Sequence, residues 1–229
     1  EAFRVIDRRV LGLLQRTPRN SRVVDLGSGV GSSLLWLRQQ ISFEGFGVTI
    51  SAEQARIAAD AFGRTTGLTS LHGSFAALPP EVTNIDVAFA IESFVLATSP
   101  EAFFAPITER MSPGATLLVC DDFLGPNHGS HAAVVEDFRW GWVASSVIEP
   151  ERAITTAAKY GLSLVANEDL TSFVEVGRPR DHVLDVVVAV GKLFKPKSWL
   201  FRSWVGGTAL QKGLKRRAIE HRLLTFIKK

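Results

Sequence analysis

The sequence predicts an α/β fold built on a doubly wound, mostly parallel sheet of seven strands. Strand-like and helix-like segments alternate along the 229 residues, which is typical of a parallel sheet with helices on both faces. The apolar run 22–26 is followed by three glycines at alternate positions, which predicts a strand, a tight turn and a helix. Hydrophobic residues make up 46% of the chain, enough to exclude a disordered protein and to form a core.

The expected elements follow one another with few interruptions. Each expected strand is a short apolar or β-branched run bounded by turn residues, and these runs cover residues 22–26, 45–49, 68–72, 85–90, 115–120, 162–168 and 221–227. Periodic apolar residues and capping signals predict helices over residues 3–15, 31–40, 51–65, 100–112, 150–161, 180–194 and 207–218.

A chain of this length fits one domain, and we expect residues 1–229 to form it. Residues 171–220, between the sixth and last strands, are expected to form a helical lid, since connections this long are usually functional. No apolar run reaches the roughly 18 residues that a membrane-spanning helix needs. The absence of a signal peptide and the single cysteine, Cys120, predict a cytoplasmic protein.

Charge is distributed unevenly along the chain. Residues 176–229 contain 13 basic and 3 acidic side chains, whereas residues 1–175 contain 13 basic and 20 acidic ones. A binding site for an anionic partner and a solvated basic face both explain this segregation. No nucleic-acid-binding motif is present, so a nucleic-acid partner is not favoured, and the sequence leaves homo-oligomer formation open.

The turn after the first strand is the strongest functional signal. It begins at Asp25 and contains Gly27, Ser28, Gly29 and Gly31. Such glycines let a ligand lie against the backbone, and the following helix N-terminus attracts negative charge. A dinucleotide fingerprint would need glycine where Ser32 stands and an acid about 20 residues further on. A P-loop is excluded because no Gly-Lys-Ser/Thr follows, although a nicotinamide dehydrogenase and a turn without a ligand stay open as alternatives.

The order Asp-x-Gly-x-Gly-x-Gly over residues 25–31 resembles motif I of the class I S-adenosylmethionine (SAM) methyltransferases. The resemblance covers residues 3–170 and the last strand. It implies a Rossmann-like SAM-dependent methyltransferase domain with strand order 3-2-1-4-5-7-6 and an antiparallel last strand. It also implies that SAM is the cofactor, with its amino-acid end held by the acid and the glycines.

The segment 47–54, Gly-Val-Thr-Ile-Ser-Ala-Glu-Gln, narrows the resemblance to one subgroup of these methyltransferases. Most class I methyltransferases have an acid after the second strand to bind the ribose, but this chain has Thr49 and Ile50. The departure resembles the cyclopropane-fatty-acid synthases and the sterol C-methyltransferases, which carry Gly-x-Thr-x-Ser-x-x-Gln. That resemblance places Thr49, Ile50 and Gln54 at the ribose. Ser51 and Gln54 also have the spacing of a helix-capping box, and both interpretations are compatible.

Further along the chain, the resemblance completes the expected cofactor site. Gly73, Ser74 and Phe75 follow the third strand, where relatives often have an Asp that binds adenine. Ser74 is expected to bind the adenine instead, with Phe75 beside it. Ala90, near the end of the fourth strand, is the last expected cofactor contact.

Glu92 is the candidate that bears on the type of reaction. It follows the fourth strand, whose carboxyl end faces the cleft in this architecture. It resembles the acid in sterol and prenyl-diphosphate C-methyltransferases. Attack of an alkene on the SAM methyl group leaves a carbocation, which a nearby carboxylate stabilises and deprotonates. The alternative is that Glu92 only contacts the SAM amine or a helix N-terminus.

Two other side chains complete the catalytic candidates. Asp122 is expected just after the fifth strand, on the substrate side. His128 lies in a loop with His131 and is a candidate base for an oxygen or nitrogen nucleophile, with a solvated loop as the alternative. Their spacing is not typical of metal ligands, so no metal site is predicted.

The C-terminal third suggests an apolar acceptor. Aromatic clusters at 138–142 and 199–204 suit a long apolar molecule, although they also suit core packing. An anionic head group, if the acceptor has one, is expected at Arg178, Arg180, Lys195 and Lys197. The preferred hypothesis is therefore C-methylation of an isoprenoid, sterol-like or lipidic alkene in secondary metabolism. The alternatives are O- or N-methylation of a natural-product scaffold and a SAM-binding protein without catalysis.

Overall fold

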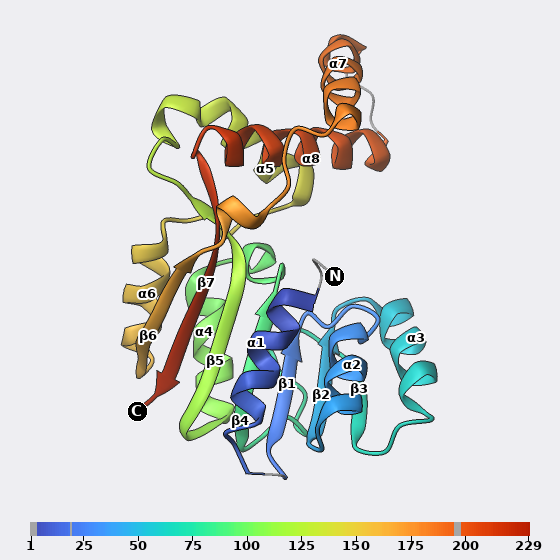
Figure 1. Cartoon of the computed structure of the whole chain (residues 1–229), viewed down its shortest axis with the longest axis vertical. Helices are drawn as coiled ribbons and strands as arrows, with labels where there is room; N and C mark the ends of the chain where they lie inside the picture. The colour runs from blue at the N-terminus through green and yellow to red at the C-terminus, as the bar shows by residue number, and fades with distance from the viewer. Residues whose placement is uncertain (1–3, 19, 195–197) are drawn as a thin grey trace.

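The computed structural model describes residues 4–18, 20–194 and 198–229. Its seven strands form one sheet in the order β3-β2-β1-β4-β5-β7-β6, with β7 antiparallel to both of its neighbours (Figure 1). This arrangement confirms the expected fold class and strand order. The strands are β1 (Arg22–Leu26), β2 (Glu44–Thr49), β3 (Leu68–His72), β4 (Ile85–Ile91), β5 (Met111–Leu124), β6 (Leu162–Asp169) and β7 (Ile219–Lys228).

Helices cover both faces of the sheet (Figure 1). One apolar cluster joins the sheet to α1 (Arg4–Leu14), α2 (Ser32–Gln40) and α3 (Ala52–Phe62). The cluster on the opposite face joins it to α4 (Pro100–Arg110) and α6 (Pro150–Lys159), with Phe94, Phe103 and Phe104 at its centre. Three short 3₁₀ turns complete the connections: η1 (Phe94–Leu96), η2 (Gly129–His131) and η3 (Thr171–Phe173).

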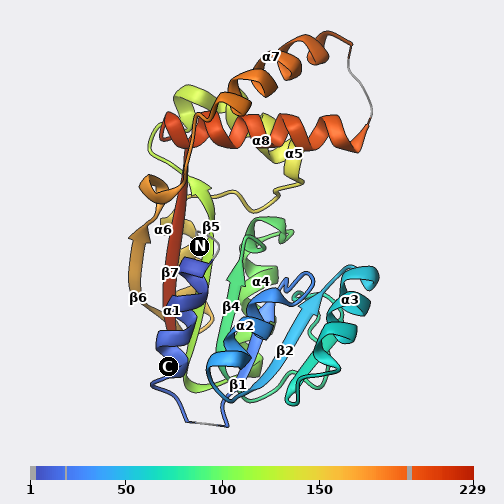
Figure 2. The ribbon, with the colours of Figure 1, turned by 45° about the vertical axis from the view of Figure 1, so that its right-hand side comes forward.

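Three helices lie together beyond one end of the sheet, and we call them the lid. They are α5 (Ala132–Trp142), α7 (Pro179–Phe194) and α8 (Trp199–Lys215) (Figures 1 and 2). The helices α5 and α8 approach closely because Gly141 faces Gly206, where a Cβ on either residue would overlap its neighbours. A third apolar cluster, including Phe138, Leu214 and Ile219, joins this pair to the ends of β5 and β7.

The lid corrects two expectations. The segment 199–204 is the start of α8 rather than a linker before a helix at 207, because Ser198 caps the helix by accepting the Phe201 N–H at 3.2 Å. The helix runs on through Gly206, which packs against Gly141 and Trp142 of α5. The helix α5 was not expected, and it extends the lid beyond residues 171–220.

The strand β5 is also longer than expected. Asp121 and Asp122 do not follow the strand but lie within it, since β7 pairs with β5 as far as Leu124. Aspartate is depleted in strands, which is why the sequence suggested an earlier end. Pairing with β7 overrides this preference and fixes the faces that the two carboxylates occupy.

Candidate functional site

The three glycines after β1 all adopt the left-handed conformation, with φ of 90° at Gly27, 54° at Gly29 and 77° at Gly31. Packing requires two of them, since a Cβ at Gly27 would overlap Ser93 and a Cβ at Gly31 would overlap the Phe62 ring. A Cβ at Gly29 would meet no described atom within 4 Å. Gly29 is therefore the glycine of this turn that has open space beside its backbone, which a ligand could fill.

The neighbouring β2 holds this turn in place. The N–H groups of Gly27 and Ser28 both donate to the Val48 carbonyl, at 2.8 and 3.0 Å. The Ser28 Oγ is buried and has no hydrogen-bond partner among the described residues. An unpartnered buried hydroxyl beside an open glycine is the kind of group that a polar ligand satisfies.

Asp25 lies at the end of β1 and is only 4% exposed. Burial, and after it the charge of Asp7 on α1, raises the pKa of Asp25 to about 8. Asp7 is itself buried, and its Oδ2 accepts from Arg4 at 2.6 Å while its Oδ1 has no partner in the described part of the chain. Two buried carboxyl groups near the glycine turn form a site suited to a ligand ammonium group. The sequence reasoning missed Asp7, whose only signal was an acid within an apolar helix.

The raised pKa predicts how Asp25→Asn changes stability with pH. The folded state holds the Asp25 proton more tightly than the unfolded chain, whose carboxyl pKa is near 3.8. This tighter proton binding stabilises the folded protein; its contribution to the free energy of unfolding is fully present below about pH 4 and is lost as the pH rises through about 8. We expect the Asn variant to gain in Tm relative to the wild type from pH 5 to pH 9. Asp60→Asn on the exposed face of α3 is the control, and parallel Tm profiles for Asp25→Asn and the wild type would contradict the assignment.

The residues expected at the ribose come together at the carboxyl end of β2. The Thr49 hydroxyl donates to Gln54 Oε1 at 3.0 Å, and Ser51 Oγ accepts the Gln54 N–H at 3.3 Å, which confirms the cap. Ile50, between them, is 70% exposed despite its apolar side chain. This edge therefore offers polar groups and an apolar surface side by side, as a nucleoside requires.

The residues expected at the adenine follow β3 in the next loop. The Gly73 N–H donates to the Thr49 carbonyl at 2.9 Å, which ties this loop to the ribose side. Ser74 Oγ accepts the Ala76 N–H at 3.1 Å, and the Phe75 ring packs edge-on against Phe103 with centroids 5.4 Å apart. Ala90 is fully buried near the end of β4. The adenine role of these residues stays a prediction.

Glu92 is exposed and fixed between the glycine turn and β5. Its φ of 52° is left-handed, a conformation that costs a non-glycine residue about 1–2 kcal/mol. The Glu92 N–H donates to the Cys120 carbonyl at 2.9 Å, and the next residue, Ser93, packs beneath Gly27 and donates to the Leu26 carbonyl. Backbone strain held in place by packing on both sides is typical of functional positions.

A second group of polar side chains lies beside Glu92. His221 on β7 contacts two residues of β5, with Nδ1 2.9 Å from Asp122 Oδ1 and Nε2 3.3 Å from Cys120 Sγ. Burial lowers the pKa of His221, but its hydrogen bonds to Asp122 and Cys120 outweigh burial and raise the pKa to about 11. Burial also raises the pKa of the Cys120 thiol, and the charges of Asp121 and Glu92 raise it further, so Glu92 lies within electrostatic reach.

The sequence reasoning missed His221, which was expected only as the start of the last strand. The pair depends on the register of β5 and β7, which places Asp122 directly opposite His221. Ile91, at the end of β4, is level with Cys120, so Asp122 lies two residues beyond that end. The pair therefore lies beyond the carboxyl end of β4, in the part of β5 that pairs with β7 alone.

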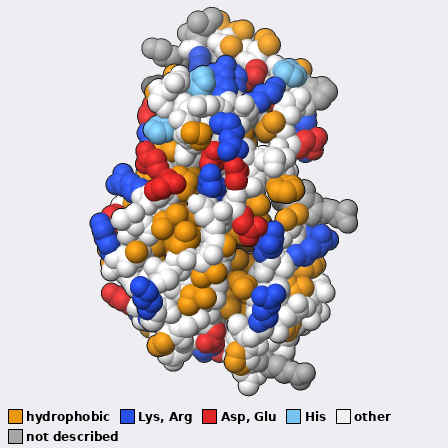
Figure 3. Space-filling view, turned by 60° about the vertical axis from the view of Figure 1, so that its left-hand side comes forward, with side chains coloured by type: hydrophobic (Ala, Val, Ile, Leu, Met, Phe, Trp, Pro, Cys, Tyr) orange, Lys and Arg blue, Asp and Glu red, His pale blue; other side chains and the backbone are white. Residues whose placement is uncertain are grey.

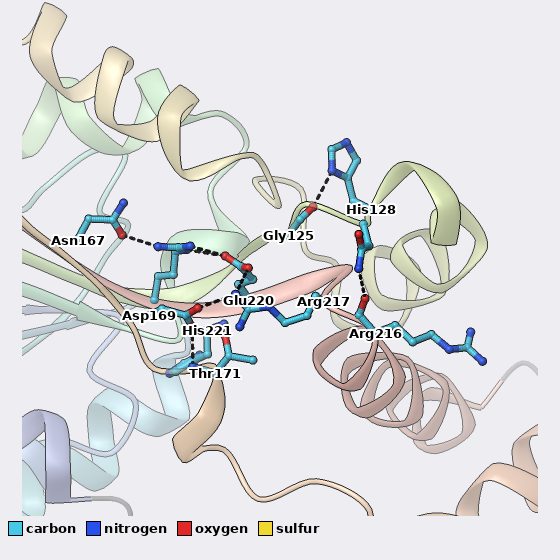
Figure 4. A network of polar contacts seen from close by, with 11 residues as sticks. Gly125, His128, Asn167, Asp169, Thr171, Arg216, Arg217, Glu220 and His221 are labelled. Atoms are coloured by element: carbon cyan, nitrogen blue, oxygen red, sulfur yellow. Dashed lines mark hydrogen bonds and ion pairs between the residues drawn. The ribbon is translucent and has the colours of Figure 1, made fainter.

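His128 lies in a different place from Glu92 and Asp122. Its Nδ1 is 2.8 Å from the Gly125 carbonyl (Figure 4), and its Nε2 is 3.6 Å from Glu149. It lines a cavity of about 370 Å³ in which Arg217 and Arg222 both pair with Glu220. Neither Glu92 nor Asp122 is among the described residues that line this cavity. His131 ends η2 immediately before α5, and a catalytic role for either histidine stays a prediction.

The described ranges contain no cluster of three His, Cys, Asp or Glu side chains able to hold a metal ion. Within the same ranges, no helix combines the length and apolar character needed to cross a membrane. Lys195 and Lys197, expected at an acceptor head group, lie outside the described residues. Arg178 and Arg180 lie at the start of α7.

Comparison with known proteins extends these observations. The family model described as "Methyltransferase domain" matches residues 1–165. Squalene methyltransferase 1 of Botryococcus braunii is 26% identical over 180 residues, covering 75% of this chain and 47% of that protein. O-methyltransferase cnsE of Penicillium expansum is 29% identical over 116 residues, covering 49% of this chain and 42% of that protein. The chain therefore spans about half the length of these curated relatives.

A solved structure of a geranyl diphosphate methyltransferase in complex with SAM has the same fold. It superposes with a TM-score of 0.75 over 98% of this chain and 84% of that one, at 16% sequence identity. At this identity the likeness establishes the architecture alone.

Proposed function

Because the chain belongs to the methyltransferase domain family, whose cofactor is SAM, we propose that it methylates a carbon atom of an isoprenoid, sterol-like or other lipidic alkene. The observation that carries the proposal is the position of Glu92, an exposed acid with a strained backbone that directly precedes Ser93, which packs against Gly27 of the glycine turn. The names of the squalene and geranyl diphosphate methyltransferase relatives support an isoprenoid acceptor.

The side chains around the turn fit SAM. The ammonium group of the cofactor suits Asp25 and Asp7 Oδ1, which has no hydrogen-bond partner among the described residues. The rest of the amino-acid end of the cofactor fits the open space beside the Gly29 backbone. Thr49 and Gln54 offer hydroxyl and amide groups to a ribose, and exposed Ile50 offers an apolar surface to a base. When bound, SAM would supply an electrophilic methyl group, which passes from sulfur to the acceptor.

Glu92 provides what carbon methylation needs from the protein. The electron pair of the alkene forms the new carbon–carbon bond, and the bond between the methyl group and sulfur breaks. The acceptor is left as a carbocation, which the negative charge of the Glu92 carboxylate stabilises. Glu92 then takes a proton from the adjacent carbon, and the double bond re-forms.

The Asp122–His221 pair is poorly suited to deprotonate an oxygen acceptor. Hydrogen bonds to Asp122 and Cys120 raise the pKa of His221, which favours the imidazolium over a free base. That imidazolium neutralises Asp122, so Glu92 supplies the uncompensated negative charge beside a developing cation. O-methylation is the second candidate, favoured by the similarity to O-methyltransferase cnsE.

We expect transfer of a labelled methyl group from SAM to carbon. The protein would be incubated with labelled SAM and a panel of prenyl diphosphates, sterols, unsaturated acyl lipids, squalene, phenols and amines, with products resolved by mass and NMR. Label on a carbon of an alkene is the expected result. Label on oxygen or nitrogen would refute carbon methylation, and tight binding of S-adenosylhomocysteine without any product would indicate a non-catalytic SAM-binding protein.

A further inference from the structure

The helix α7 presents an apolar stripe to solvent. Val183 begins the stripe, and the remaining members lie three, four, seven and eleven residues further on, which places them on one side of a helix: Val186, Val187, Val190 and Phe194. Their exposed fractions range from 41% to 79%. The other side of α7 packs against α8 through Val188, which is 4% exposed, and Gly191, where a Cβ would overlap the Phe201 ring.

The stripe lies at one pole of the molecule. Figures 1 and 2 both show α7 as the element of the lid farthest from the sheet. Trp199 and Leu200, at the start of α8, are 78% and 44% exposed and add to the apolar surface of the lid. A monomeric protein rarely leaves so many large apolar side chains of one element in water, so this face is expected to have a partner.

The lid that carries the stripe is rich in basic residues. On α7 itself the charges are balanced, since Arg180 lies 3.8 Å from Asp181 and Lys192 pairs with Asp137 on α5. Between residues 178 and 217 the basic side chains far outnumber the two acidic ones, Asp181 and Asp185. In Figure 3, Lys, Arg and His side chains gather at the lid end of the molecule, beside exposed apolar ones. An exposed apolar helix face on a part of the protein with net positive charge suits the surface of an anionic membrane.

We propose that α7 docks the protein on an anionic lipid surface, with its axis parallel to the membrane and its apolar stripe in the headgroup region. The helix is about 24 Å long, which suits binding in the plane of the interface rather than insertion. A second copy of the chain fits this face less well, because a symmetric contact would bring the basic surroundings of α7 against themselves. This inference goes beyond the methyl-transfer activity, and no turnover is needed to test it.

The test is co-sedimentation of the full chain with phosphatidylcholine vesicles with and without phosphatidylserine. We expect binding to the phosphatidylserine vesicles that weakens as salt is added. The double variant Val186→Asp/Val190→Asp is expected to lower the partition coefficient about tenfold or more, because charged groups replace the centre of the stripe. Arg180→Glu is expected to lower binding to anionic vesicles and to leave binding to neutral vesicles unchanged.

The control is Ile57→Asp on α3, which places one such charge at an exposed apolar residue outside the lid, and each single variant, Val186→Asp and Val190→Asp, is compared with it. Ile57→Asp is expected to bind vesicles like the wild type, and circular dichroism would check that all variants fold. Equal partition of the double variant and the wild type would overturn the proposal. A dimer in light scattering that the double variant converts to a monomer, without vesicle binding by either protein, would assign the stripe to a second copy instead.

Discussion

Glu92→Gln is expected to lower the rate of carbon methylation by about 10²–10⁴-fold, the range for removal of a positioned acid or base. Glutamine keeps the size and hydrogen-bonding ability of the side chain, and the backbone bond from residue 92 to Cys120 does not depend on the side chain. The loss would therefore report the missing negative charge beside the carbocation and the missing proton acceptor. The measurement is the single-turnover rate of label transfer to the acceptor found in the panel.

Two measurements separate this catalytic effect from damage to the site. Binding of S-adenosylhomocysteine by calorimetry is expected to be unchanged in Glu92→Gln, because the glycine turn and the ribose edge are untouched. Glu109→Gln on α4 is the matched control and is expected to keep wild-type turnover. If Glu92→Gln turned over carbon acceptors at nearly the wild-type rate, the role assigned to Glu92 would be wrong.

Gly29→Ala and Gly31→Ala are expected to have different effects although the residues are only two positions apart: the first lowers ligand affinity, and the second lowers stability. Alanine at 29 meets no described atom within 4 Å, so its cost to stability is limited to the left-handed backbone, about 1–2 kcal/mol. Its methyl group fills the open space of the turn, so the affinity for S-adenosylhomocysteine should fall at least about tenfold, or 1.4 kcal/mol.

Alanine at 31 carries the same backbone cost and also overlaps the Phe62 ring, which adds about 1–3 kcal/mol of overpacking. The expected result is a clearly lower Tm for Gly31→Ala than for Gly29→Ala, measured by thermal unfolding beside the calorimetric titration. Wild-type affinity in a folded Gly29→Ala variant would show that the ligand does not approach the turn at this residue.

Much of the fold, the glycine turn and the position of Glu92 could be predicted from local sequence patterns. The strand β1, its glycine turn and the Ser51 cap depend on neighbouring residues alone, because φ, turn geometry and capping are set within a few positions. The position of Glu92 followed from a strand end, which is also local. The end of β5 was wrong because pairing with β7, distant in sequence, overrode the preferences of Asp121 and Asp122, and the start of α8 was wrong because Ser198 caps the helix.

The sequence by itself determined the doubly wound sheet, the left-handed turn at Gly27, Gly29 and Gly31 and the acid that follows β4, because short-range backbone geometry and hydrophobic periodicity specify them. Only the tertiary structure decided that His221 joins Asp122 and Cys120, since that contact rests on the pairing of strands about one hundred residues apart. The same holds for the buried Asp7 beside Asp25 and for the exposed face of α7. Which side chains are desolvated, paired or left in water depends on long-range packing, and that packing sets the pKa values and surfaces on which function depends.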